Sequence, residues 1–154
     1  PSILTAAQVG YGRNMLRRGT EVEQMMKVVG EEGTSMEDFV VYLKGDFLDA
    51  VYLQQNSFDA VDDAVSVERQ RYIYAIILRV LGSEFVFEAK DEARGFFNKL
   101  RSSFIDYNYA AWDSAEFKKN EEAVMSLIAG KATNLDPKAE KLIKATEACH
   151  EESI

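Results

Sequence analysis

The chain has 154 residues, of which 47% are hydrophobic and 29% charged, and its formal net charge is −8. A chain of this length and composition can bury a full apolar core, which excludes general disorder. The acidic balance argues against a nucleic-acid partner, because such proteins present basic patches to phosphates. The sequence has neither a signal-peptide pattern nor a run of about 20 apolar residues that could cross a membrane, so we expect a soluble intracellular protein.

Only two prolines occur, Pro1 and Pro137, and no long segment alternates between apolar and polar residues. These features predict an all-α fold, a single helical bundle of about six helices with no sheet. The first helix is predicted from about Tyr11 to Val29 and ends at Gly30, since glycine readily ends a helix. Its apolar residues recur at helical spacing along one stripe, namely Met15, Val22, Met25, Met26 and Val29.

The second helix is predicted from about Met36 to Gln55, with Ser35 as its N-terminal cap. Glu37 and Asp38 fall in its first turn, where the positive end of the helix dipole favours acids. Apolar side chains cover nearly its whole circumference, so we expect it to be buried on several sides, in part against a neighbouring domain. These side chains are Val40, Val41, Tyr42, Leu43, Phe47, Leu48, Val51, Tyr52 and Leu53.

The rest of the chain is predicted to form a loop from Asn56 to Val65 and then four more helices. The third helix is capped by Ser66 and closed by Gly82, and the fourth runs from about Ser83 to Tyr107. The fifth starts at Asp113 or Ser114 and ends before Gly130, and the sixth has Asp136 as its cap and Pro137 as its first residue. The apolar stripes of the last three helices are Ala89, Ala93, Phe96, Phe97, Leu100 and Phe104; Phe117, Val124, Leu127 and Ile128; and Ala139, Leu142, Ile143 and Cys149.

Residues that could catalyse a reaction are scarce. The sequence has no Gly-x-x-x-x-Gly-Lys-Ser/Thr phosphate loop and no group of His, Cys and carboxylates at metal-binding spacing. One cysteine, Cys149, excludes an internal disulfide, and with His150 it makes a poor nucleophile and base because adjacent helical residues point about 100° apart. We therefore expect neither a metal site nor independent catalysis. Adjacent acids such as Glu31 and Glu32 are typical of a solvated face.

One segment, from Gly45 to Asp62, combines unusual residues. Three amide side chains, Gln54, Gln55 and Asn56, stand with Phe58 at the end of a buried helix, directly before an acidic loop. From these residues alone, Phe58 is an anchor of the loop in the core, and the amides satisfy the free backbone groups of the helix end. A binding role remains open at this point.

The strings Asp46-Phe-Leu, Leu53-Gln-Gln-Asn-Ser-Phe58 and Val61-Asp62 resemble the "DFLQQNAF…VD" signature of catalytic A subunits of V-type and archaeal-type rotary ATPases. Further strings that resemble this family in the same order are Met15-Leu-Arg-Arg-Gly19, Val28-Val-Gly30 and Val67-Glu-Arg-Gln70. The resemblance covers about residues 11–82, and residues 83–154 are assigned to the same C-terminal helical domain by continuity. This sequence departs from the family in having Asp49 to Leu53 between the two halves of the signature, which predicts a shifted helix register.

The resemblance implies a function for the complete subunit. That subunit makes or hydrolyses ATP, binding ATP or ADP with Mg²⁺ on an upstream nucleotide domain that this chain lacks, and couples the reaction to H⁺ or Na⁺ transport. The fragment alone is expected to bind no cofactor and to be inactive. Phe58 matches the family position near the adenine, with Gln54, Gln55 and Asn56 as further candidates for the wall of the nucleotide site.

The resemblance also implies a contact with the central rotor at the turn from Gly30 to Asp38. Glu31, Glu32, Glu37 and Asp38 match an acidic rotor-facing loop in location and sign. The implied partners are the B subunits and the central stalk subunits, with the membrane involved only through the ion-translocating sector, and the implied location is the soluble, cytoplasmic head. The alternative is a free-standing helical protein-interaction module, whose apolar second helix docks a partner.

Overall fold

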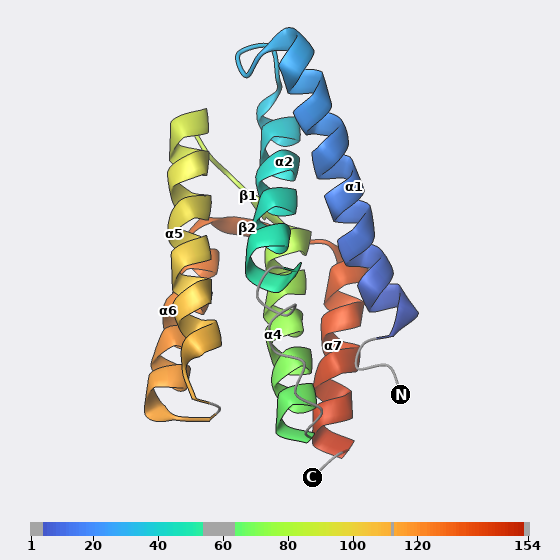
Figure 1. Cartoon of the computed structure of the whole chain (residues 1–154), viewed down its shortest axis with the longest axis vertical. Helices are drawn as coiled ribbons and strands as arrows, with labels where there is room; N and C mark the ends of the chain where they lie inside the picture. The colour runs from blue at the N-terminus through green and yellow to red at the C-terminus, as the bar shows by residue number, and fades with distance from the viewer. Residues whose placement is uncertain (1–4, 54–63, 112, 153–154) are drawn as a thin grey trace.

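The computed structural model describes residues 5–53, 64–111 and 113–152 (Figure 1). These residues form six α-helices, which are α1 (Ala6–Val29), α2 (Met36–Leu48), α4 (Ala64–Gly82), α5 (Lys90–Tyr109), α6 (Ala115–Lys131) and α7 (Pro137–Glu152). A π-helix, η1 (Asp49–Leu53), continues α2 in the five residues that separate the halves of the signature. The prediction of an all-α bundle of about six helices is confirmed.

The helices lie in three neighbouring pairs (Figure 1). Helices α1 and α2 form a long hairpin, α4 packs against α7, and α5 packs against α6. Helix α2 also contacts α5, so it lies inside the bundle. Eight of its residues are buried, among them Phe39, Val40, Phe47 and Leu48, which confirms the prediction of a helix buried on several sides.

A short sheet is present where none was expected. Strands β1 (Ser83–Phe85) and β2 (Ala132–Leu135) pair antiparallel, with an irregular register between Glu84 and Phe85. The fourth helix therefore begins at Lys90 and not at Ser83, and Ala89 is its exposed N-cap. The physical reason is the Phe85-Val86-Phe87 run, because aromatic and β-branched side chains favour an extended backbone that points alternate residues to the core.

Three of the six helix starts, those of α2, α6 and α7, follow the predicted caps, and α6 ends at Lys131 and not before Gly130. The Ser35 and Ser114 hydroxyls accept hydrogen bonds from the backbone N–H groups of Asp38 and Phe117, each at 3.1 Å. Pro137 is the first residue of α7. Two starts were predicted too late: α4 begins at Ala64, so Ser66 lies inside it, and α1 begins at Ala6. A reciprocal pair of hydrogen bonds between Thr5 and Gln8 fixes the start of α1.

The core is built around aromatic side chains of α2 and α5. The Phe47 ring lies edge-on to Phe104, with 5.4 Å between their centroids, and to Phe97 at 6.4 Å. Edge-to-face pairs of this kind add about 0.5–1.5 kcal/mol beyond the area that they bury. The predicted stripe of α5 is therefore the seam that holds this helix to α2.

Two of the polar contacts that join the α1–α2 hairpin to the rest of the domain involve Lys44 and Tyr11. The Lys44 ammonium, almost fully buried, donates a hydrogen bond to the Ser83 carbonyl oxygen at 2.6 Å. Burial lowers the pKa of Lys44 to about 8, since a low-dielectric site disfavours the charged form. The Tyr11 hydroxyl donates to the Asp136 carboxylate at 2.8 Å. Together these contacts tie α2 to β1, and α1 to the start of α7.

Helices α1 and α2 also touch backbone to backbone. A Cβ atom built on Gly19 would lie 3.3 Å from the Gly45 Cα atom and 3.4 Å from the Val41 carbonyl oxygen. Both positions therefore need glycine for the close approach of the two helices. Beyond this crossing, toward the connecting turn, α1 lies beside α2 alone (Figure 1).

Candidate functional site

The turn between α1 and α2 projects at one end of the molecule (Figure 1), and we call residues 30–35 the tip. Gly30 ends α1 with a φ of +81°, and its N–H donates to the Met26 carbonyl oxygen at 2.8 Å. The Thr34 N–H donates to the Glu31 carbonyl oxygen at 3.1 Å, and the Thr34 hydroxyl donates to the Gly30 carbonyl oxygen at 2.9 Å. The tip is thus a hydrogen-bonded turn with a defined shape.

The four acids predicted to meet the rotor all lie at or beside this turn, but they differ in surroundings. The Glu31 carboxylate forms an ion pair with Arg94 of α5. Glu32 and Glu37 are exposed, and within the described residues neither forms an ion pair. Asp38 is half-buried in the first turn of α2. The structure therefore leaves Glu32 and Glu37 as the acids most open to a partner.

Three apolar side chains of α1 stand exposed next to these acids. Val28 is 86% exposed, Val29 50% and Met25 37%, although the sequence pattern assigned Met25 and Val29 to the core stripe. That prediction was wrong for these two residues because α1 has only α2 beside it at this end, so its stripe has nothing further to cover it. We call Met25, Val28 and Val29 the apolar rim of the tip. In the sequence, this rim is indicated by the apolar pair Val28 and Val29 directly before Gly30.

The second predicted site follows the other end of α2. Gln54, Gln55, Asn56 and Phe58 lie outside the described residues, so their assignment to a nucleotide site stays a prediction. The helix end that leads to them is firmly held. The Asn108 side-chain amide of α5 donates to the Val51 carbonyl oxygen of η1 at 3.1 Å.

An aromatic pair holds the same helix end from the side of α4. The Tyr52 ring of η1 packs edge-on against Tyr74, with 5.1 Å between their centroids. The Tyr74 hydroxyl donates to the Gln8 carbonyl oxygen of α1 at 2.8 Å, and burial raises the pKa of Tyr74 to about 12. The helix end at η1 is therefore held by direct contacts with α4 and α5, and through Tyr74 it is linked to α1.

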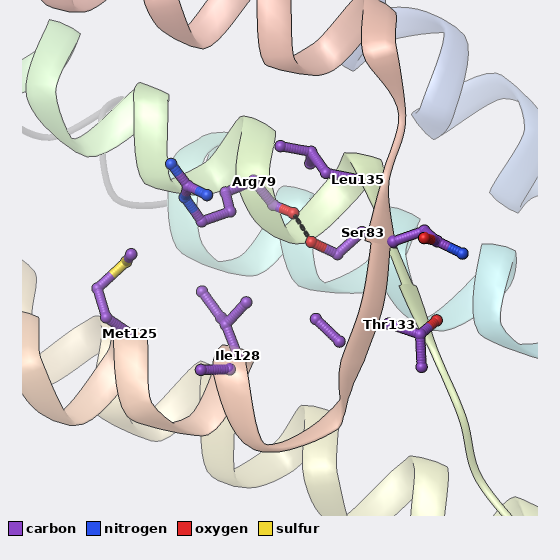
Figure 2. Close-up of a pocket in the computed structure, with 9 residues that line it drawn as sticks. Arg79, Ser83, Met125, Ile128, Thr133 and Leu135 are labelled. Atoms are coloured by element: carbon purple, nitrogen blue, oxygen red, sulfur yellow. Dashed lines mark hydrogen bonds between the residues drawn. The ribbon is translucent and has the colours of Figure 1, made fainter.

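An open pocket lies between α6, β2 and the C-terminal end of α4 (Figure 2), and its volume is about 240 Å³. Met125, Ile128 and Leu135 form much of its wall, and Arg79 is the one charged side chain among its nine lining residues. The Ser83 hydroxyl donates to the Arg79 carbonyl oxygen at 2.5 Å. None of these residues was expected from the sequence to be functional, and their chemistry offers no acid–base pair.

The described residues contain no group of three or more His, Cys, Asp or Glu side chains that could hold a metal ion. None of the helices found in them is both long and apolar enough to cross a membrane.

Comparisons with known proteins identify the family to which the chain belongs. Residues 12–92 match the family model described as the C-terminal domain of V and A type ATP synthase. The chain belongs to this family of domains. It is similar to the V-type ATP synthase alpha chain of Treponema denticola, with 65% identity over 94% of this chain and 24% of that protein.

Other relatives extend the similarity. The V-type ATP synthase alpha chain 1 of Treponema pallidum is 60% identical over 96% of this chain and 25% of its own length. The alpha chain of Borrelia turicatae is 50% identical over 84% of this chain and 22% of its own length. The chain thus spans about a quarter of these relatives. No solved structure matches it significantly.

Proposed function

We propose that this domain belongs to a subunit that makes or hydrolyses ATP with Mg²⁺ and that it transmits movements of the nucleotide domain to a central rotor. Ion transport, of H⁺ or Na⁺, takes place in a separate membrane sector. The partners are the B subunits and the central stalk subunits, and the domain lies in the soluble head at the cytoplasmic side. The family match and the names of the relatives support this proposal.

The exposed apolar rim beside the acids carries the rotor contact. Apolar side chains as open as Val28 are ordinary when single, but three together at a projecting turn are typical of an interaction surface. Exposed ion pairs contribute only about 0.2–1 kcal/mol each, so Glu32 and Glu37 favour a basic partner without being individually essential. The surface therefore fits a rotor segment that combines apolar side chains with lysine or arginine.

Replacing both Val28 and Val29 by serine in the assembled ATPase should lower the number of ions transported per ATP hydrolysed at least about twofold, because a few central apolar contacts dominate most interfaces. The rate of ATP hydrolysis by the detached head should not change. Val86 is a suitable control, since it is a 60% exposed valine on the segment that follows β1, and Val86→Ser should leave the ratio unchanged. A deletion of residues 31–34 that left coupling and torque intact would refute the rotor contact.

For the nucleotide site, we propose that Phe58 stacks on the adenine and that Gln54, Gln55 and Asn56 line the same wall. Phe58→Ala in the full-length subunit should weaken ATP binding about tenfold, the effect expected when one base loses an aromatic face. Fluorescent-nucleotide titration would measure this. Tyr109→Ala removes an exposed aromatic ring from α5 and serves as the control. Equal affinities in wild type and Phe58→Ala would remove the assignment.

A further inference from the structure

The first turns of α5 lie beside the tip, although some 60 residues of sequence separate them (Figure 1). Lys90 and Arg94 are four residues apart, so their side chains emerge on the same side of α5. The Lys90 ammonium donates to the Glu31 backbone carbonyl oxygen, and the Arg94 guanidinium pairs with the Glu31 carboxylate. One residue of the tip is therefore held through both its backbone and its side chain.

Arg94 is itself fixed in position. Its guanidinium carbon lies 5.3 Å from the centroid of the Phe39 ring, which is buried in the first turns of α2. An arginine over an aromatic face gains a cation–π attraction and loses freedom to reorient. Asp91 of α5 also pairs with Arg94, at 2.7 Å. Arg94 thus connects the tip, the start of α2 and the start of α5.

The start of α5 is anchored on its other side as well. Glu92 forms an ion pair with Lys131 at the end of α6, and its carboxylate accepts a hydrogen bond from the Glu88 N–H at 2.9 Å. These contacts lower the pKa of Glu92, with the hydrogen bond from Lys131 as the largest cause. A force on the tip can therefore pass through α5 to the junction of α6 and β2.

We propose that Lys90 and Arg94 form a brace that sets the angle of the tip, and that Glu31 serves this brace and not the rotor contact. The inference rests on the proposed function, in which the tip meets the rotor. It divides the four acids by role: Glu31 positions the tip, whereas Glu32 and Glu37 are left to face the partner. Lys90 and Arg94 are positioning residues, because they act on the rotor contact through the tip.

The first test measures the brace by itself. In the full-length alpha chain before assembly, the double variant Lys90→Gln, Arg94→Gln should show amide hydrogen exchange in residues 28–35 at least about threefold faster than wild type, since local opening controls exchange. Arg101→Gln is the matched control. It lies on the same helix, its side chain is 40% exposed against 41% for Arg94, and it pairs with Asp46 of α2 at 3.6 Å. The control should exchange like wild type in this segment.

A charge reversal tests whether Arg94 and Glu31 are in direct contact. Arg94→Glu alone should speed the exchange of residues 28–35, and adding Glu31→Arg should restore slow exchange because the ion pair is rebuilt with its signs reversed. If the double glutamine variant exchanges like wild type, or if the reversed pair restores nothing, the brace is refuted while the rotor contact of the apolar rim is untouched.

The second test asks whether the brace serves coupling. In the assembled ATPase, the double glutamine variant should transport fewer ions per ATP, whereas Arg101→Gln should not. Faster exchange with unchanged coupling would overturn the positioning role. The Val28 and Val29 variants decide separately whether the tip contacts the rotor, so the two failures can be told apart.

Discussion

Replacing Phe104 by alanine should lower the free energy of unfolding by about 3–5 kcal/mol, the range for a phenylalanine removed from a packed core. Phe104 is fully buried and packs edge-on against Phe47 of α2, and its centroid lies 5.6 Å from that of Tyr107. The substitution would open a cavity at the seam between α2 and α5. Urea denaturation followed by circular dichroism would measure the loss.

Tyr109→Ala is the control for this substitution, because it removes an aromatic ring that is 77% exposed from the same helix. Its effect should stay within about 0.5 kcal/mol, as for most surface substitutions. Equal losses for the two variants would show that the aromatic seam does not hold α5 in place.

Gly82→Ala should lower the free energy of unfolding by about 1–3 kcal/mol, since overpacking forces the backbone to shift. A Cβ atom on Gly82 would lie 2.4 Å from the Ala139 Cβ atom and 3.3 Å from the Tyr11 hydroxyl oxygen. Ala139 is fully buried, and its Cβ is fixed to the backbone of α7, so α4 and α7 would have to move apart. Thermal unfolding would report this as a lower melting temperature.

The same substitution, glycine to alanine, is expected to have the opposite effect on stability at Gly95. It lies in α5, is exposed, and has nothing within 4 Å of a built Cβ atom. Gly95→Ala should therefore stabilise the domain, by up to about 1 kcal/mol, because alanine favours the helix. A Gly82→Ala variant as stable as Gly95→Ala would contradict the close packing at Gly82.

The elements that could be predicted are those specified by neighbouring residues. Ser35 and Ser114 cap the next residues along the chain, and Phe97, Leu100 and Phe104 form a stripe through helical spacing alone. Local rules of this kind need no knowledge of the fold. The strand at Ser83 was missed because its partner, Ala132 to Leu135, is about 50 residues away in sequence.

The features of the candidate sites also differ in whether neighbouring residues or the packing of the helices specify them. The acids of the tip were found because they flank Gly30 and Ser35 in sequence. The pairing of Glu31 with Arg94 was not foreseen, since it depends on how α5 packs against α2. Whether Met25 and Val29 are covered depends on which helices lie beyond α2, and spacing along one helix does not contain that information.

The glycine contact between α1 and α2 defines a fulcrum. Val29 lies ten positions beyond Gly19 along α1, and at a rise of about 1.5 Å per residue this stretch is an arm about 15 Å long. A tilt of about 10° around that point would carry the end of the arm roughly 3 Å, since an α-helix of this length behaves as a short rod. Tyr11 lies on the side of the fulcrum away from the tip, and Lys44 lies next to Gly45 at the fulcrum itself. Both residues hold the hairpin to the rest of the domain. A small rotation of the hairpin at the glycine contact therefore suffices to move the tip end of α1 by about the diameter of a water molecule.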